Sequence, residues 1–321
     1  MLTFWKKPGK KEGISCVIRA RNEAEWARLS IVSILEFADE IVFVDNGSID
    51  GTLELVRELK DGWGIEKLKI HTFPFVDAKK VKMSDLCNFA FGRATRSWLF
   101  LWDADFIART DQVYSIMELK ELWGEFRHKV DFFRLAGPNL WGDHKHYILD
   151  LPHDPEFCFN RYLFRNRKWK YQMWNERENL VLKAHPRSLH IGPPADTQDR
   201  RVYFYHMKGL KPDDNIAFRK CMAGWWEYCE KNPGHEKSYE QWRAEFFKTP
   251  DLKEQIRLAM EGQLKTGNLR RFEKVGGDWG DYPSLLAPYL EDPKYEVVYA
   301  DGKPVRRVIR HDKPIPLPEK S

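Results

Sequence analysis

Residues 40–52, EIVFVDNGSIDGT, join an apolar run to a cluster of turn-forming residues. The run at residues 40–45 is short and has no helical period, which predicts a strand buried on both faces. Residues 46–51 are rich in Asn, Gly, Ser and Asp, which favour tight turns. A helix is expected next, over residues 53–60. A buried strand, a turn and a helix in this order form the first part of a crossover between parallel strands.

Strands and helices alternate on both sides of this unit. Short apolar runs predict further strands at residues 14–20, 68–73 and 97–102, and residues 83–94 predict a helix. Asn22 and Glu25, three residues apart, predict the capped start of a helix after the first strand. This alternation indicates an α/β fold with a mostly parallel sheet.

Polar residues follow the predicted strands at the points where these strands end. The three polar clusters are residues 19–23, 45–50 and 103–105. Ligands bind at the carboxyl ends of the strands in parallel sheets. The sequence therefore predicts a ligand site at that edge.

The pattern changes after Asp105. We expect strands at residues 130–136, 161–164 and 201–206, helices between 213 and 265, and a β-hairpin of residues 295–299 and 305–310. The last residues, HDKPIPLPEKS, form a Pro-rich tail.

Composition limits the class of protein. The chain has 321 residues, of which 42% are hydrophobic and 31% charged, which excludes a disordered or collagen-like chain. Its apolar runs are far shorter than the roughly 20 residues of a membrane-spanning helix, so no transmembrane segment is expected. The start, MLTFWKKPGKK, lacks the pattern of a signal peptide.

The charge and the cysteines bear on partners and compartment. The formal net charge is +5, from 53 basic and 48 acidic residues, which permits a polyanionic partner without requiring one. The five cysteines are scattered and include no C-x-x-C pair, so neither a zinc ribbon nor a disulfide framework is predicted. We expect a reducing, cytoplasmic compartment, with peripheral attachment to a membrane left open.

Asp103-Ala104-Asp105 directly follows the predicted strand at residues 97–102. Two carboxylates at positions i and i+2 of a strand end can both reach one divalent cation. Hard oxygen ligands suit Mg²⁺ or Mn²⁺, and these ions bridge the oxygens of a diphosphate. The alternative is a solvated acidic turn whose Asp caps a helix.

Three segments together resemble family 2 glycosyltransferases. They are VIRARNEAE at residues 17–25, EIVFVDNGSIDGT at 40–52 and LFLWDADF at 99–106. The resemblance covers residues 14–106 and continues to about residue 230, where it is nearest to the lipopolysaccharide-core glucosyltransferase subgroup. It implies the GT-A fold, a Rossmann-like sheet flanked by helices that binds a nucleotide sugar.

The resemblance also implies roles for matching residues. His206 would complete a metal site, and Asp45 would contact the base of the nucleotide. Glu176 would be the catalytic base, with Asp143, Asp150, Asp154 and Glu178 as alternatives. The implied nucleotide-sugar residues are Ala20, Arg21, Asn22, Glu23, Asp45, Lys82, Asn88, Asp103 and Ala104, and the implied metal ligands are Asp103, Asp105 and His206.

The same resemblance predicts how the chain is divided. A GT-A catalytic domain would span residues 13–210, with a nucleotide-sugar half at 13–106 and an acceptor half at 107–210. A basic tail would precede it at residues 1–12. A helical extension would follow at 211–292, and a hairpin with the Pro-rich tail at 293–321.

The implied function is a metal-dependent inverting glycosyltransferase that uses Mn²⁺ or Mg²⁺ and a nucleoside diphosphate sugar, UDP-linked. The acceptor would be a hydroxyl group of a glycan, with DNA or protein as alternatives. The sugar, the linkage and the oligomeric state stay open. A sugar-phosphate nucleotidyltransferase is a second hypothesis, although it would carry a Gly-rich loop where this chain has ARARNEAE. A non-catalytic module that binds glycan or nucleic acid is a third.

Overall fold

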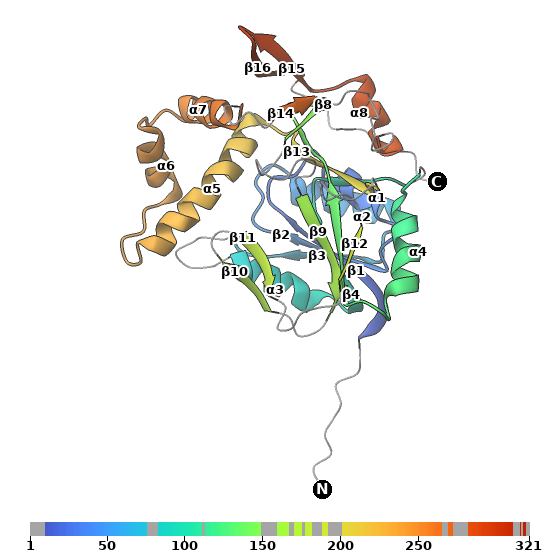
Figure 1. The fold of residues 1–321 in the computed structure, drawn as a ribbon. Coiled ribbons are helices and arrows are strands. Elements are labelled where there is room, and N and C mark those ends of the chain that lie inside the picture. The colour runs from blue at the N-terminus through green and yellow to red at the C-terminus, as the bar shows by residue number, and fades with distance from the viewer. Residues whose placement is uncertain are drawn as a thin grey trace.

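The computed structural model describes most of the chain. The described residues are 10–75, 83–110, 113–148, 159–166, 170–174, 177–181, 188–191, 201–264, 269–271, 282–310, 315 and 317–318. Figure 1 shows a central sheet with helices packed on both of its faces, a group of helices to one side and a small hairpin at one end.

The central sheet has the strand order β12-β6-β9-β4-β1-β2-β3. Its pairs are parallel except at β9, which runs antiparallel to both β4 and β6. The strands are β1 (Lys11–Ala20), β2 (Glu40–Asp45), β3 (Leu68–Thr72), β4 (Arg96–Asp103), β6 (Phe132–Gly137), β9 (Phe159–Arg165) and β12 (Ser188–Ile191). The predicted α/β fold with a mostly parallel sheet is confirmed.

Both faces of this sheet are buried, which explains its continuous apolar strands. Ile14, Cys16 and Ile18 of β1 pack with α1 (Ala27–Ser33), α2 (Thr52–Trp63) and α4 (Ile116–Phe126). Val17 of β1 packs on the opposite face with α3 (Met83–Arg93). Successive side chains of a strand point to opposite faces, so one strand serves two cores.

The register of the strands fixes the edge that carries the site. Ala20 of β1 pairs with Asp45 of β2, and Arg19 pairs with Asp103 of β4. The carboxyl ends of these three neighbouring strands therefore lie level with one another. The polar clusters that follow them in the sequence meet at this edge, as the sequence predicted.

A second sheet of order β14-β8-β7-β13-β5 carries the remaining part of the site. Its strands are β5 (Phe106–Ala108), β7 (Asn139–Trp141), β8 (Asp143–Ile148), β13 (Phe204–Gly209) and β14 (Leu269–Arg271). β13 pairs with β5 so that His206 lies opposite Phe106, the residue after Asp105. The strands β10 (Lys170–Trp174) and β11 (Arg177–Val181) form a separate antiparallel pair.

Three local predictions need correction. β1 begins at Lys11, inside the stretch predicted as a tail, because Lys11 pairs with Arg96. β13 starts at Phe204 and runs to Gly209, because it pairs with β7 as well as β5, so His206 lies inside the strand and not at its end. Asn22 does not cap α1, which has no side-chain cap.

The C-terminal part is helical and ends in a hairpin, as predicted. Its elements are α5 (Asp213–Lys231), α6 (Tyr239–Phe247), α7 (Leu252–Leu264), η1 (Ser284–Leu286), α8 (Ala287–Glu291), β15 (Tyr295–Ala300) and β16 (Lys303–Val308). Asp301 and Gly302 join the two strands with φ angles of 50° and 73°, the left-handed conformation that two-residue hairpin turns require.

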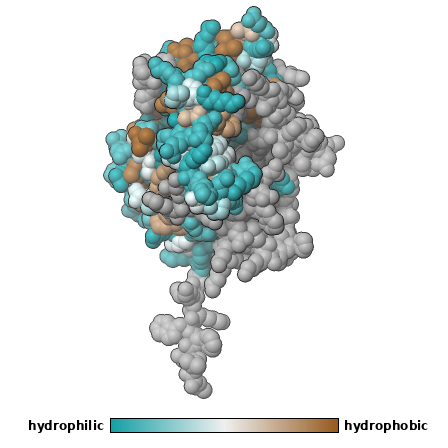
Figure 2. Space-filling view, turned by 90° about the vertical axis from the view of Figure 1, so that its left-hand side faces the viewer, coloured by the Kyte–Doolittle hydropathy of each residue, from teal (hydrophilic) through white to brown (hydrophobic). Residues whose placement is uncertain are grey.

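The face that carries these helices is mostly hydrophilic, with scattered apolar residues (Figure 2). The exposed apolar side chains there include Phe246 and Leu252. Within the described ranges, every helix is too short or too polar to cross a bilayer.

Gly209 makes a testable contribution to the packing of β13. A Cβ atom at this position would lie 2.6 Å from Cγ and 2.7 Å from Cα of Trp141. Such a clash involves backbone and cannot be relieved by a side-chain rotation. We expect Gly209→Ala to lower the free energy of unfolding by about 1–3 kcal/mol, measured by urea denaturation. Gly62→Ala is the matched control, since nothing lies within 4 Å of a Cβ there. Equal stability of the two variants would contradict this assignment.

Candidate active site

Asp103, Asp105 and His206 bring one ligand atom each to within 4.8 Å of one another. Asp103 ends β4, Asp105 lies in the turn after it, and β13 supplies His206. His206 Nδ1 is 2.6 Å from Asn139 Oδ1, and its Nε2 is 3.0 Å from Asp105 Oδ2. Burial lowers the pKa of His206 to about 4, so its imidazole is neutral at neutral pH. A neutral imidazole that donates its Nδ1–H to Asn139 keeps a lone pair on Nε2, which lies beside Asp105 Oδ2. The Nε2 and Oδ2 atoms are then both acceptors, and such a pair suits one shared cation.

Asp105 is fully buried and surrounded by cations. Burial raises its pKa, but the neighbouring His206 and the positive charges of Lys211 and Arg219 outweigh this and hold the pKa of Asp105 well below its usual range. Its Oδ1 atom is buried and has no hydrogen-bond partner among the described residues. A buried carboxylate oxygen without a partner is costly. The three ligand residues, together with the unpaired Oδ1 of Asp105, therefore fit a divalent cation held by Asp103, Asp105 and His206.

Lys211 joins Asp105 to Glu23 in a buried ion cluster. Its Nζ lies 2.8 Å from Glu23 Oε1 and 2.5 Å from Asp105 Oδ2. Glu23 is 1% exposed, and burial raises its pKa against the opposing charges of Arg219 and Lys211. Arg219 of α5 forms ion pairs with both carboxylates, and its side chain is 41% exposed. Arg219 therefore closes the cluster on the side that faces solvent.

A cavity of about 260 Å³ lies beside this cluster. One face of α5 contributes Arg219, Met222 and Trp226, which lie three and four residues apart and so share a side of the helix. The other lining residues are Arg19, Ala20, Arg21, Asn46, Phe75, Met83, Leu86, Asp103 and Phe218. The cavity thus joins the strand ends to the C-terminal helices.

Arg21 organises the far wall of the cavity. Its Nη1 donates to the carbonyl oxygens of Asn46 and Gly47, each at 3.0 Å. Its guanidinium lies 3.6 Å from the centre of the Phe75 ring and 5.3 Å from that of Phe218. The positive charge of Arg21 therefore stabilises the cavity wall, and the rings of Phe75 and Phe218 line the cavity beside it.

The turn at residues 46–51 is tied to the loop after β1. Ser48 Oγ accepts the N–H of Asn22 at 2.9 Å, and Thr52 Oγ1 accepts that of Glu23 at 2.7 Å. Asn22 has a φ of 55°, and its Oδ1 accepts the N–H of Ile49. This bond explains why Asn22 does not cap α1: its side chain bonds to the neighbouring turn.

Asp45 serves the same turn through only one of its oxygens. Its Oδ2 accepts the N–H groups of Gly47 at 3.0 Å and Ser48 at 3.1 Å. Its Oδ1 is buried and has no hydrogen-bond partner in the described part of the chain. Asp45 therefore combines a structural role with one free acceptor.

The structure distributes the predicted site residues over several places. Ala20, Arg21 and Asp103 line the cavity, whereas Glu23, Asp105 and His206 lie in the buried cluster behind it. Asn22 and Asp45 hold the turn, and Ala104 is packed in the hydrophobic core. Asn88 is exposed on α3. Lys82 and Glu176 lie outside the described residues.

Sequence reasoning missed Lys211 and Arg219. Lys211 follows the predicted histidine strand, and Arg219 belongs to the α5 face that also carries Met222 and Trp226. The sequence signal for Arg219 is a basic residue at the start of a helical face that continues with the apolar residues Met222 and Trp226. No local pattern marks Lys211, because its partner Glu23 lies 188 residues away in the chain.

Known proteins resemble this chain in its first part. Residues 15–123 match the model described as glycosyl transferase family 2. Poly-beta-1,6-N-acetyl-D-glucosamine synthase of Staphylococcus epidermidis is 31% identical over 111 residues, which are 33% of this chain and 25% of that protein. The chain therefore spans about a quarter of the length of this curated relative.

Solved structures resemble a larger part of the chain at low sequence identity. The mannosyltransferase PcManGT from Pyrobaculum calidifontis, in complex with GDP-Man and Mn²⁺, is 14% identical with a TM-score of 0.40, over 82% of this chain and 80% of that one. S. aureus TarS 1-349 is 12% identical with a TM-score of 0.39, over 95% and 99% of the two chains.

The family match begins in β1 and extends into α4, so it includes the strand ends that carry Asp45, Asp103 and Asp105. Residues 15–123 of this chain are therefore similar to glycosyl transferase family 2, as the sequence motifs indicated.

Proposed function

We propose that this protein is a metal-dependent inverting glycosyltransferase that uses a nucleoside diphosphate sugar. One observation carries the proposal. Asp103 and Asp105, at the end of β4 and within the residues that match the family 2 model, converge with His206 of β13 beside a cavity. Bound Mn²⁺ or Mg²⁺ would neutralise charge on the diphosphate leaving group.

The side chains around this point support a phosphate-binding role. Arg219 is partly exposed at the cavity wall, and its guanidinium can donate hydrogen bonds to phosphate oxygens. Lys211 stays behind it, buried against Glu23 and Asp105. The positive charge of the site therefore faces the side from which an anionic donor would enter.

Asp45 and Phe75 support a nucleotide in the cavity. Phe75 lines the cavity and offers a ring face for packing, and Asp45 lies directly before the lining residue Asn46, where its unpaired Oδ1 can accept the ring N–H of a uracil base. This is our reason to propose a UDP-linked donor. A buried carboxylate oxygen selects a base that donates a hydrogen bond at that position.

The reaction is a single displacement at the anomeric carbon. A catalytic carboxylate removes the proton from the acceptor hydroxyl, the acceptor oxygen bonds to the anomeric carbon, and the bond from that carbon to the diphosphate breaks. The transition state resembles an oxocarbenium ion. The nucleoside diphosphate leaves with the bonding electrons, and because the acceptor attacks the opposite face, the configuration of the anomeric carbon is inverted.

A screen of nucleotide sugars tests the proposal. The purified protein is incubated with each donor and Mn²⁺ or Mg²⁺, and released nucleoside diphosphate is measured. We expect UDP release from at least one UDP-sugar. Pyrophosphate release from a nucleoside triphosphate and a sugar 1-phosphate, without any UDP release, would instead support a nucleotidyltransferase. Failure to cleave any of the donors would favour a non-catalytic binding module.

Glu176 remains our proposed catalytic base. Glu176→Gln keeps the shape of the side chain and removes its basicity. We expect turnover to fall by roughly 10²–10⁴-fold, the usual contribution of a general base. Single-turnover kinetics with the acceptor found for the wild type measures the effect on the chemical step.

Glu178→Gln is the matched control for this experiment, because Glu178 lies two residues away in β11. We expect a small effect there. A large loss in Glu178→Gln together with normal turnover in Glu176→Gln would transfer the role to Glu178.

A further inference from the structure

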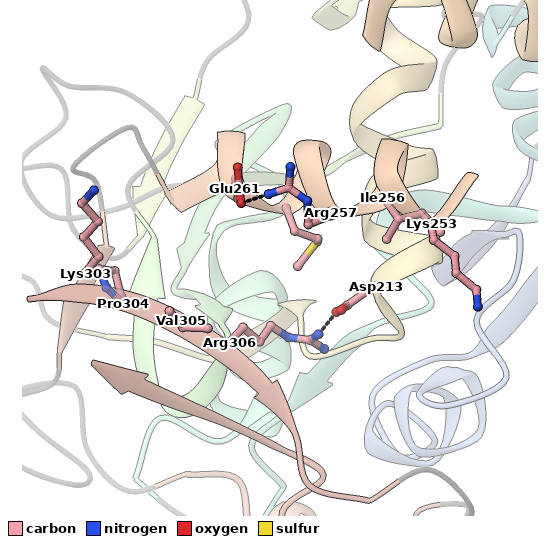
Figure 3. Close-up of a pocket in the computed structure, with 10 residues that line it drawn as sticks. Asp213, Lys253, Ile256, Arg257, Glu261, Lys303, Pro304, Val305 and Arg306 are labelled. Carbon is pink, nitrogen blue, oxygen red and sulfur yellow. Dashed lines mark hydrogen bonds and ion pairs between the residues drawn. The ribbon is translucent and has the colours of Figure 1, made fainter. Parts of the chain in front are cut away.

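A second and larger cavity lies between α7 and the terminal hairpin. Its volume is about 920 Å³, within the range of small-molecule sites. Its lining residues are Asp213, Lys253, Ile256, Arg257, Met260, Glu261, Lys303, Pro304, Val305 and Arg306. The lining comes from the start of α5, from α7 and from β16, so this cavity is separate from the one at the strand ends (Figure 3).

The charges of this cavity are unbalanced in favour of cations. Arg257 is paired with Glu254 and Glu261, and Arg306 with Asp213. Lys253 and Lys303 have no ion-pair partner among the described residues and extend on opposite sides of the view in Figure 3. Two unpaired ammonium groups around one cavity attract a phosphate or carboxylate group.

The remaining walls are apolar. Ile256 and Met260 of α7 face Pro304 and Val305 of β16. A molecule that suits both parts of the lining carries an anionic group and also a less polar surface. A sugar ring with a phosphate or carboxylate substituent has both, since the C–H face of the ring packs on apolar side chains while the substituent reaches an ammonium group.

Arg306 connects this cavity to the catalytic cluster. Its side chain is 3% exposed, and its guanidinium bonds to the carboxylate of Asp213 and to the carbonyl oxygen of Lys211. Its Nε atom is buried and has no hydrogen-bond partner in the described ranges. The side chain of Lys211 ends on Asp105. A single residue therefore separates the lining of this cavity from the metal site.

We propose that the cavity between α7 and β16 binds the acceptor, and that the acceptor is a saccharide with a phosphate or carboxylate group. The inference rests on the proposed glycosyltransferase function, because only a transferase needs a second substrate beside its donor. Buried Lys211 and Arg306 lie between this cavity and the metal site, so the bound saccharide is the charged end of a longer acceptor whose reacting hydroxyl reaches the donor.

Binding without donor or metal tests the site by itself. Glucose 6-phosphate and glucose are titrated into the EDTA-treated protein, with affinities measured by ligand-detected NMR. We expect glucose 6-phosphate to bind at least about tenfold more tightly, and saturating UDP not to displace it. The double variant Lys253→Gln/Lys303→Gln should bind glucose 6-phosphate about tenfold more weakly than the wild type.

The matched control removes two exposed lysines elsewhere, in Lys129→Gln/Lys248→Gln, and should bind like the wild type. Equal affinity for the two sugars, displacement by UDP, or equal weakening in both double variants would each overturn the site.

Transfer assays test the identity of the ligand. Using the donor from the screen, phosphorylated, uronic and neutral saccharides are compared by mass spectrometry of the products. We expect kcat/KM at least about tenfold higher for the anionic acceptors, and an acceptor KM raised about tenfold in Lys253→Gln/Lys303→Gln. Equal use of neutral saccharides would overturn an anionic acceptor. Absence of any donor cleavage would instead contradict the proposed function, and the binding result would still decide the site.

Discussion

Asp105→Asn is expected to lower turnover by at least about 10³-fold. The substitution keeps the size of the side chain and removes the charge that would hold a divalent cation beside Asp103 and His206. A metal ion contributes several kcal/mol of charge stabilisation in the transition state, and each 1.4 kcal/mol is about tenfold in rate. Initial rates of nucleoside diphosphate release measure the effect, and Mn²⁺ binding is followed by electron paramagnetic resonance.

Chelation should reproduce this loss in the wild type. EDTA should abolish turnover, and added Mn²⁺ or Mg²⁺ should restore it in the wild type but not in Asp105→Asn. Asp61→Asn is the control, because Asp61 is exposed on α2 and away from the strand ends. Circular dichroism confirms that each variant is folded. Full turnover in EDTA, or normal kinetics in Asp105→Asn, would show that the cluster does not act through a metal.

The sequence was sufficient for the first half of the site because that half depends on local order. A buried strand followed by Asp103 and Asp105 places both carboxylates at one strand end. The parallel register with β1 then brings Arg19 and Asp103 level. These relations follow from strand direction alone, so a chain of short apolar runs with polar ends predicts them.

The second half depends on contacts between distant segments. Arg219 bonds to Asp105, which lies 114 residues earlier in the chain, and to Glu23, which lies 196 residues earlier. His206 could be predicted only from the resemblance, since nothing in its own neighbourhood marks it as a ligand. For Asn22 the local pattern was misleading. Its position fits the pattern of a helix cap, but its side chain accepts the N–H of Ile49 in the adjacent turn instead.

The arginines in and just after β16 are paired with carboxylates in the structure. Arg306, Arg307 and Arg310 lie close together in the sequence and could have formed one surface for a polyanion. Arg306 is instead buried against Asp213, while Arg307 is paired with Glu296 and Arg310 with Asp292. Much of their charge is therefore balanced within the chain. The lysines around the second cavity, which no sequence cluster indicated, have no ion-pair partner among the described residues.

Lys211→Met is expected to lower the free energy of unfolding by about 3–5 kcal/mol, the usual cost of removing one partner of a buried ion pair. Methionine preserves the length of the side chain and removes its charge. Glu23 and Asp105, both at most 1% exposed, would then share only Arg219. Urea denaturation in EDTA measures the loss. Lys231→Met is the matched control, because Lys231 lies on α5 and pairs with Glu227 while 69% exposed. Exposed pairs contribute less than about 1 kcal/mol, so that variant should resemble the wild type.

Two further measurements separate lost charge from lost packing in Lys211→Met. Adding Glu23→Gln removes one of the carboxylates left uncompensated, and should recover part of the stability. Mn²⁺ should stabilise the single variant more than the wild type, because a cation at Asp105 replaces some of the missing charge and ligands stabilise the state that binds them. A loss that neither Glu23→Gln nor Mn²⁺ reduces would indicate a packing defect. A variant as stable as the wild type would mean that Lys211 does not compensate the two carboxylates, and that water or Arg219 performs this role.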